Sequence, residues 1–416
     1  RSNLTERAEE EAIKVFALNL KPLLMQPPVK GKTVMGIDPA FRTGCKVAVM
    51  DDTGKLLAFT TIYPTEPQNQ VEKAKKEMKD LILKYNVDII AIGNGTASRE
   101  TEMIVSEMIK EVDKDISYII VNEAGASVYS ASEIGQEEFP DLDVSIRGAI
   151  SISRRLQDPL AELVKIEPKH IGVGQYQHDL NQGKLNQALE GVVEDCVNTV
   201  GVDLNTASPS LLRYVSGISS RVALNLIKYR EEKGKFSNRE ELLKVKGLGP
   251  KTFIQCAGFL RIPGGSNPLD NTAVHPESYS IAEKLLGNNI DESNIESLSQ
   301  ELDVGPLTLK DIIGELKKPG RDPREEMPKP IFRTDVLKME DLKEDMILTG
   351  TVRNVVDFGA FVDIGVKQDG LIHISHLSDK YIKHPKEVVK VGDIVKVRIL
   401  GVDIDRGRIS LSIKDV

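Results

Sequence analysis

The chain has 416 residues, and since a domain usually holds roughly 150 residues, this length predicts several modules rather than one core. The formal net charge of −8 at pH 7 argues against a nucleic-acid binder unless basic side chains are concentrated in one part of the chain. No apolar run approaches the ~20 residues that cross a bilayer, so no membrane partner is expected.

The cysteines indicate the compartment. Cys45, Cys196 and Cys256 are too far apart for a Cys-x-x-Cys metal site and too few for a disulfide framework. They favour a reducing, cytoplasmic setting. Because residue 1 is Arg rather than Met, the chain is also expected to be part of something longer.

The N-terminal half reads as a helix followed by an α/β domain. An amphipathic helix is predicted over residues 4–20, which Pro22 is expected to end, inside a linking region of residues 1–32. Three hairpin-like strands and then helix–strand alternation predict a mixed sheet covered by helices over residues 33–167. Its strands are expected at 34–37, 46–50, 56–62, 87–92 and 117–121, and its helices at 68–84, 98–109 and 146–166.

The C-terminal half predicts two further kinds of fold. After a connector at 168–204, residues 205–262 hold an internal repeat of two glycine motifs 30 residues apart. A helical, acidic segment ending in a linker follows at 263–330. Short alternating strands with Gly turns then predict a small β-barrel within 331–416. The fold class is therefore multi-domain: α/β, all-α and β-barrel.

The charges are distributed unevenly over these modules. Residues 205–262 carry 11 basic and 4 acidic side chains, a net charge of +7. Residues 1–204 carry −9 and residues 263–330 carry −6, whereas the barrel is nearly neutral. Residues 205–262 are thus a basic segment in a chain whose net charge is negative, and this segment coincides with the glycine repeat.

The repeat resembles tandem helix-hairpin-helix motifs, in Gly217-Ile-Ser219 and Gly247-Leu-Gly249-Pro-Lys251. A glycine hairpin at a helix start turns backbone N–H groups outward, where they hold a phosphate without reading base identity. Ser219 replaces a glycine in the first copy. The alternative is a glycine cap between two packed helices. The residues predicted to bind phosphate are Gly217, Lys246, Gly247, Gly249 and Lys251.

The C-terminal 72 or so residues resemble an S1-type RNA-binding OB barrel, in Gly350-Thr-Val-Arg353 through Phe358-Gly-Ala-Phe361, Asp369-Gly-Leu-Ile-His373 and Arg408-Ile-Ser-Leu-Ser. The resemblance implies that Phe358, Phe361 and His373 form an aromatic platform on which bases stack. Arg353 and Arg408 are expected to contact phosphates beside it. Core packing is the alternative for Phe361. No metal is expected at His373 and His376, since no cysteine cluster is near.

The α/β domain resembles the RNase H-like fold of Holliday-junction resolvases, in Gly36-Ile37-Asp38 and Arg42-Thr43-Gly44. Such nucleases hold two divalent ions with several carboxylates. The candidates here are Asp38, Glu123 and Asp158, but Asn94 follows the strand where those enzymes place an acid. Asp158 precedes Pro159, so it is also a candidate helix N-cap. An incomplete catalytic set is expected, with no cofactor, and Mg²⁺ only if the domain is a nuclease.

The order of all these motifs resembles the bacterial Tex family of transcription accessory proteins over essentially the whole chain, with an N-terminal helical part missing. Further matching stretches begin at Ile92-Gly-Asn-Gly, Asn122-Glu-Ala-Gly and Arg154-Arg-Leu-Gln. The resemblance implies a non-enzymatic transcription factor that binds RNA, expected to be single-stranded, with little sequence preference. DNA, RNA polymerase and the ribosome are further candidate partners. The alternatives are a Mg²⁺-dependent RNase H-like or resolvase-like nuclease and a protein-docking scaffold.

Overall fold

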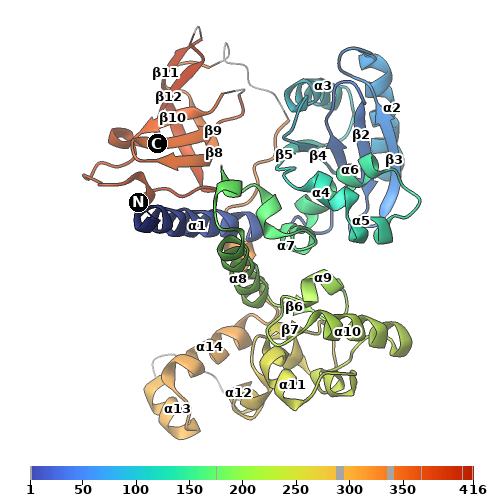
Figure 1. The fold of residues 1–416 in the computed structure, drawn as a ribbon, viewed down its shortest axis with the longest axis vertical. Helices are drawn as coiled ribbons and strands as arrows, with labels where there is room; N and C mark the ends of the chain where they lie inside the picture. Colours follow the sequence, from blue (N-terminus) through green and yellow to red (C-terminus); the bar gives the residue numbers. More distant parts are fainter. Residues whose placement is uncertain are drawn as a thin grey trace. The chain divides into compact units, whose positions relative to one another are not determined.

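The structure is a computed structural model that describes residues 2–174, 176–286, 295–334, 342–366, 368–404, 406–414 and 416. Two compact units divide the chain (Figure 1). The first comprises residues 1–17, 163–169 and 176–327, and the second comprises residues 18–162, 170–175 and 328–416. No helix in the described part of the chain is long and apolar enough to cross a membrane.

The first helix, α1 (Ser2–Leu24), is longer than predicted. Pro22, which was expected to end it, lies inside the helix. A proline lacks its own N–H and its ring crowds the carbonyl group four residues back, so one backbone hydrogen bond is lost. The helical pattern resumes past it, since Met25 N donates to Lys21 O at 3.0 Å. Leu20 and Leu24, both fully buried, stabilise this end of the helix.

The mixed α/β sheet is confirmed, with strand order β3-β2-β1-β4-β5. The three N-terminal strands are antiparallel, whereas β4 and β5 run parallel to β1. The carboxyl ends of β1, β4 and β5 therefore meet at one edge. The bounds are β1 (Val34–Asp38), β2 (Cys45–Met50), β3 (Leu56–Ile62), β4 (Ile89–Gly93) and β5 (Ser117–Val121).

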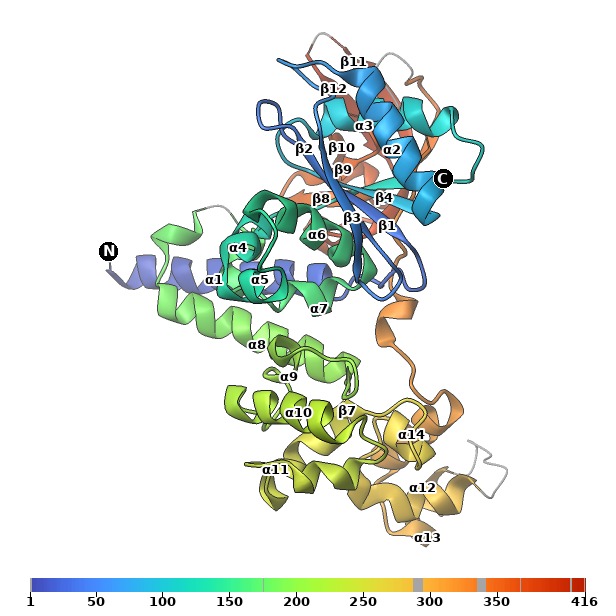
Figure 2. The same cartoon turned by 90° about the vertical axis from the view of Figure 1, so that its right-hand side faces the viewer.

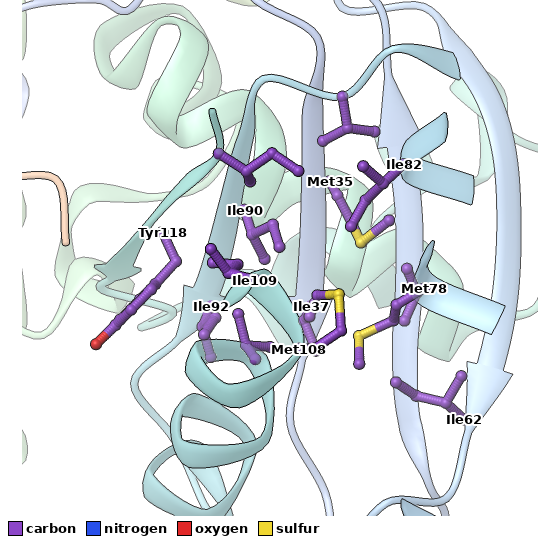
Figure 3. Packing of buried hydrophobic residues seen from close by; sticks show 14 of the residues in the cluster. Met35, Ile37, Ile62, Met78, Ile82, Ile90, Ile92, Met108, Ile109 and Tyr118 are labelled. Atoms are coloured by element: carbon purple, nitrogen blue, oxygen red, sulfur yellow. The ribbon is translucent and has the colours of Figure 1, made fainter. Parts of the chain in front are cut away.

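Helices cover both faces of this sheet. Figure 3 shows Met35, Ile37, Ile90 and Ile92 packed with side chains of α2 (Val71–Tyr85) and α3 (Ser98–Lys110). The alternate residues Val34, Ile89 and Ala91 pack on the opposite face against α6 (Val144–Gln157). Because both faces are buried, the central strands read as continuous hydrophobic runs. The short helices α4 (Ala126–Ala131) and α5 (Glu133–Glu138) lie between β5 and α6 in the chain.

The helix predicted over residues 146–166 is two helices, α6 and α7 (Pro159–Leu163). Asp158 separates them with an extended backbone, φ −151° and ψ 97°. The residue before a proline is disfavoured in the helical region, because the proline ring clashes with its backbone. The sequence Asp158-Pro159 therefore explains the break.

The all-α region belongs to the first unit (Figure 2). Two short parallel strands, β6 (Val202–Asp203) and β7 (Leu260–Arg261), join the start and end of the glycine repeat. Its helices are α8 (Gln182–Val200), α9 (Pro209–Leu212), α10 (Ser220–Lys233), α11 (Pro250–Cys256), α12 (Tyr279–Leu286), α13 (Ile295–Leu302) and α14 (Pro306–Lys317).

The predicted barrel is confirmed as a closed five-stranded barrel of order β10-β12-β11-β8-β9. Its interior is filled by aliphatic side chains such as Val352, Val362, Ile372 and Val397. The strands are β8 (Ile347–Val356), β9 (Gly359–Asp363), β10 (Gly370–His373), β11 (Ile394–Asp403) and β12 (Arg408–Ser412).

Candidate nucleic-acid interface

The structure brings the three predicted aromatic residues of the barrel together. Phe361 in β9 pairs with Leu371 in β10, and His373 pairs with Gly359, two residues from Phe361. Phe361 and His373 therefore point to the same face of the sheet. Phe358 lies in the turn before β9, and its ring centroid is 6.3 Å from that of Phe361 in an edge-on contact.

The exposure of these rings fits a contact surface. Phe358 is 52% exposed, although burying such a ring would stabilise the fold. Phe361 is partly buried, yet it is absent from the aliphatic cluster that fills the barrel. His373 is exposed, and Ser375 N donates to its Nδ1 at 3.3 Å, which orients the ring. Phe358 and His373 are thus exposed, whereas Phe361 is partly buried.

The two predicted arginines differ in their distance from this platform. Arg353 is the unpaired residue at the register shift of β8, next to Asn354, which lies opposite Phe361. Its Nη2 is 2.7 Å from Asp363 Oδ2. Burial acts to raise the pKa of Asp363, but Arg353 and Arg333 outweigh it and hold that pKa below its ordinary value. Arg408 begins β12, whose register places it opposite residue 369. It is therefore four residues, or ~13 Å along the strand, from the position opposite His373.

The two glycine hairpins have the same backbone. Gly217 and Gly247 both have positive φ, +80° and +87°. The next residue in each hairpin donates a matching hydrogen bond: Ile218 N to Val215 O at 3.0 Å and Leu248 N to Val245 O at 3.1 Å. A glycine is required at both positions because other L-residues rarely adopt this conformation.

The hairpins differ at the residue that caps the following helix. Ser219 Oγ accepts from Val222 N at 3.3 Å, so one N–H at this end of α10 already has a partner. Gly249 offers no side chain, and no heavy atom of the described residues lies within 4 Å of the place a Cβ would occupy. The second hairpin is therefore the more open to a phosphate, with Lys246 and Lys251 both exposed beside it.

One basic residue was missed by sequence reasoning. Arg221 is exposed at the start of α10, 30 residues before Lys251 at the start of α11. Aligning the two copies residue by residue would have found it. It gives the first hairpin a cation at the same place as in the second.

A third hairpin of the same kind was also missed, in residues 302–307 between α13 and α14. Val304-Gly305-Pro306 matches Leu248-Gly249-Pro250, and Leu309 N donates to Gly305 O at 3.0 Å, as Phe253 N does to Gly249 O at 2.9 Å. Asp303, with φ +50°, replaces the first glycine. Leu307, 80% exposed, replaces Lys251. This hairpin thus has an acidic and apolar tip.

The α/β domain brings two of its three candidate carboxylates together. Asp38 ends β1 and Glu123 follows β5, at the edge where the parallel strands end. The pKa of Asp38 is raised to about 6, first by burial and then by the charge of Glu123, while the charge of Lys46 acts to lower it. Burial likewise raises the pKa of Glu123, against a hydrogen bond from the Gly95 backbone and the charge of Arg155.

Two glycines make room for the Glu123 carboxylate. A Cβ at Gly93 would lie 2.2 Å from Glu123 Oε2, and a Cβ at Gly95 would lie 1.7 Å from Oε1. The loop after β4 is therefore shaped around this carboxylate. Its Oε2 is buried and has no hydrogen-bond partner among the residues that the structure describes.

The two other candidate metal ligands, Asn94 and Asp158, do not fit a two-metal centre. Asn94 Oδ1 accepts from Glu123 N at 3.0 Å, so the amide holds the loop. Asp158 Oδ1 accepts from Ala161 N at 3.2 Å, as an N-cap of α7 does. Gly148 of α6 adjoins Asp38, and Asp158 lies ten residues further on, ~15 Å along the helix. In the described part of the chain, no three acidic, His or Cys side chains are grouped to hold a metal ion.

Comparison with protein families identifies each module. Residues 32–157 match the family model "Tex protein YqgF-like domain", residues 197–261 a "helix-hairpin-helix motif", residues 267–324 an "HHH domain" and residues 341–414 an "S1 RNA binding domain". The 267–324 match covers the third hairpin, where only a helical segment was predicted. The class is therefore a multi-domain protein that joins a YqgF-like domain to helix-hairpin-helix and S1 modules.

Curated relatives are similar to this chain over nearly its whole length. "Uncharacterized protein YdcI" of Bacillus subtilis is 57% identical, over 99% of this chain and 59% of that protein. "Protein tex" of Bordetella pertussis is 52% identical, over 99% and 54%. Human "S1 RNA-binding domain-containing protein 1" is 39% identical, over 99% and 49%. This chain belongs to the Tex family, and it spans about half the length of the curated relatives that it matches.

Proposed function

We propose that this chain binds single-stranded RNA with little sequence preference and serves as an accessory factor in transcription. The barrel stacks bases on Phe358, Phe361 and His373, while the hairpins grip backbone phosphates. The observation that carries this proposal is the clustered aromatic trio on a closed S1-type barrel, in which Phe358 and His373 are exposed. Stacking on aromatic rings tolerates every base, because every base has a π-face.

Loss of the platform tests this proposal. Each of Phe358→Ala, Phe361→Ala and His373→Ala is expected to weaken binding of a single-stranded RNA about 10-fold, because base stacking contributes ~1–3 kcal/mol. The affinity is measured by fluorescence anisotropy at fixed salt. Ile404→Ala is the matched control, since Ile404 is 55% exposed on the same barrel, beyond the end of β11. Unchanged affinity in all three variants would show that the platform is not the binding site.

We propose further that the α/β domain is not a nuclease in this chain. The separation of Asp158 from Asp38 and the structural use of Asn94 support this proposal. The test is a cleavage assay on single-stranded RNA, single-stranded DNA and branched duplex, with and without Mg²⁺. Cleavage that needs Mg²⁺ and disappears in Asp38→Asn would establish the nuclease instead.

The setting of this activity is part of the same proposal. We propose that the chain acts in the cytoplasm beside RNA polymerase or the ribosome. The name of a Neisseria gonorrhoeae relative that is 52% identical, "Transcriptional accessory protein Tex", supports the part of this proposal that concerns transcription. Co-purification with RNA polymerase that survives nuclease treatment would show a direct protein contact. Loss of the association on nuclease treatment would show that nucleic acid bridges the two.

A further inference from the structure

The loop between β10 and β11, residues 377–392, carries an unexplained aromatic ring. Tyr381 is 91% exposed, the highest exposure among the large hydrophobic side chains of the described residues. The loop itself is anchored, because Leu377, Pro385 and Val389 are buried. Lys414 Nζ also lies 3.6 Å from Asp379. A fixed loop therefore presents a ring that contributes almost nothing to packing.

Two contacts place this loop beside the aromatic platform. His384 Nδ1 lies 3.8 Å from Asp357 Oδ1, and Asp357 immediately precedes Phe358. Three residues before the loop, Ile374 N donates to Phe358 O at 2.9 Å. Tyr381 is three residues from His384, and three residues span at most ~11 Å. The loop that carries the ring therefore lies against Asp357, the residue that precedes Phe358 of the platform.

The charge of the loop complements a polyanion. Four lysines are exposed in it, Lys380, Lys383, Lys386 and Lys390. Its two acidic side chains are both engaged. Asp379 faces Lys414, and Glu387 Oε1 accepts from His384 N at 3.1 Å. A ring flanked by lysines is the combination that binds single strands, since the ring stacks a base and the ammonium groups contact phosphates.

We propose that a single-stranded nucleic acid continues from the platform across this loop, where Tyr381 stacks a further base and Lys380 and Lys383 contact its backbone. This inference rests on the proposed function, and it adds a second stacking position to the same interface. The binding site then extends beyond one face of the barrel, and the affinity depends on the length of the bound strand.

A length series of oligonucleotides tests the proposal with the full chain. Tyr381→Leu keeps an apolar side chain but removes the ring, whereas Tyr381→Phe keeps the ring. Tyr381→Leu is expected to weaken binding of an oligonucleotide of ~8 nucleotides by about 5- to 10-fold and to leave binding of one of ~3 nucleotides unchanged. Tyr381→Phe is expected to bind both like the parent chain.

The outcomes separate this inference from the proposed function. If Phe358→Ala weakens the binding of both oligonucleotides and Tyr381→Leu weakens the binding of neither, the platform is supported as the binding site and the role of Tyr381 is wrong. If Phe358→Ala weakens neither, the proposed function itself fails. Equal losses for Tyr381→Leu and Tyr381→Phe would overturn the stacking role.

The lysines give an independent measurement. Lys380→Ala with Lys383→Ala is expected to reduce the slope of log affinity against log salt by about 1.4, because each contact to a single strand contributes ~0.7. Lys73→Ala with Lys76→Ala, two exposed positions of α2, is the matched control and should leave the slope unchanged. Equal slopes in the two double variants would contradict a backbone contact at the loop.

Discussion

Asp38 combines burial with a nearby like charge. Its pKa is raised to about 6, mainly by burial and then by Glu123. The pKa of an unfolded aspartate is ~3.9. Between these values the folded chain binds more protons than the unfolded chain, so the free energy of unfolding falls as pH rises through ~4 to 6.

Asp38→Asn is therefore expected to stabilise the chain above pH ~6, by about 1–3 kcal/mol, and to lose this advantage below pH ~4. Urea unfolding at a series of pH values measures the difference. Asp143→Asn is the control, because hydrogen bonds from Ser145 lower the pKa of Asp143. An Asp38→Asn chain less stable than the parent at pH 8 would show that the ionised carboxylate has a favourable partner.

Arg239 is a second residue whose role follows from its surroundings. It is 1% exposed, and its guanidinium donates to Leu260 O, Thr272 O, Val274 O and the Tyr279 hydroxyl at 2.6–2.8 Å. Asp270, also buried, accepts from Arg239 N at 3.0 Å. Arg239 thus joins the helix-hairpin-helix region of residues 197–261 to that of residues 267–324.

Removing this guanidinium leaves three carbonyl groups buried without their donors. Arg239→Met is expected to lower the free energy of unfolding by about 3–5 kcal/mol, as breaking one partner of a buried charged network does. Arg221→Met should change it by less than about 0.5 kcal/mol, since Arg221 is exposed. Urea unfolding of both variants makes the comparison, and a loss below about 1 kcal/mol for Arg239→Met would contradict the bridging role.

Among the elements, the three hairpins share a residue with positive φ and the first hydrogen bond of the following helix, but their side chains differ. The hairpin of residues 302–307 has Asp303 and Leu307 where the second hairpin has Gly247 and Lys251. An acidic tip repels phosphate, and an exposed leucine offers it no donor. We therefore expect nucleic acid to contact the second hairpin and to avoid the third.

Asp303→Gly with Leu307→Lys is expected to raise the affinity for single-stranded RNA about 3- to 10-fold at ~0.1 M salt and to steepen the salt slope by about 1. The glycine also suits the left-handed backbone at residue 303. Glu283→Lys on α12 makes the same change of net charge and serves as the control. If both variants gain affinity equally, the effect belongs to overall charge rather than to the hairpin.

At the scale of the whole molecule, the uneven distribution of charge predicts that RNA affinity depends strongly on salt concentration. The net charge of −8 opposes binding at long range, whereas residues 205–262 carry +7. The logarithm of RNA affinity should fall linearly with the logarithm of the salt concentration, and the number of phosphates contacted sets the slope. A titration from 50 to 200 mM salt measures this slope, and a flat response would rule out the phosphate contacts proposed for the hairpins.

Much of the architecture was predictable from hydrophobic periodicity. The strands of the α/β sheet and the closed barrel follow from runs whose alternate residues, such as Val34 and Met35, face different layers. The break at Asp158 was less evident, because residues 146–166 keep a helical pattern across it. The third hairpin escaped notice because an aspartate, not a glycine, adopts the positive φ at residue 303.

The candidate interface was predictable in its residue types but less so in its geometry. Phe358, Phe361 and His373 lie together as the resemblance implied, because the β9–β10 register aligns them. The position of Arg408 depends on the parallel register between β10 and β12, which sequence does not define. The exposure of Tyr381 likewise depends on how buried residues anchor its loop.

The sheet edge at β5 has a practical consequence for experiments on isolated domains. Tyr118 and Arg333 exchange two backbone hydrogen bonds, of 2.8 and 2.9 Å, so a residue far along the chain pairs with this outer strand. A fragment that ends after α6 would leave these backbone groups unpaired, and open strand edges template self-association. Such a fragment is expected to oligomerise unless residues 331–334 are supplied with it.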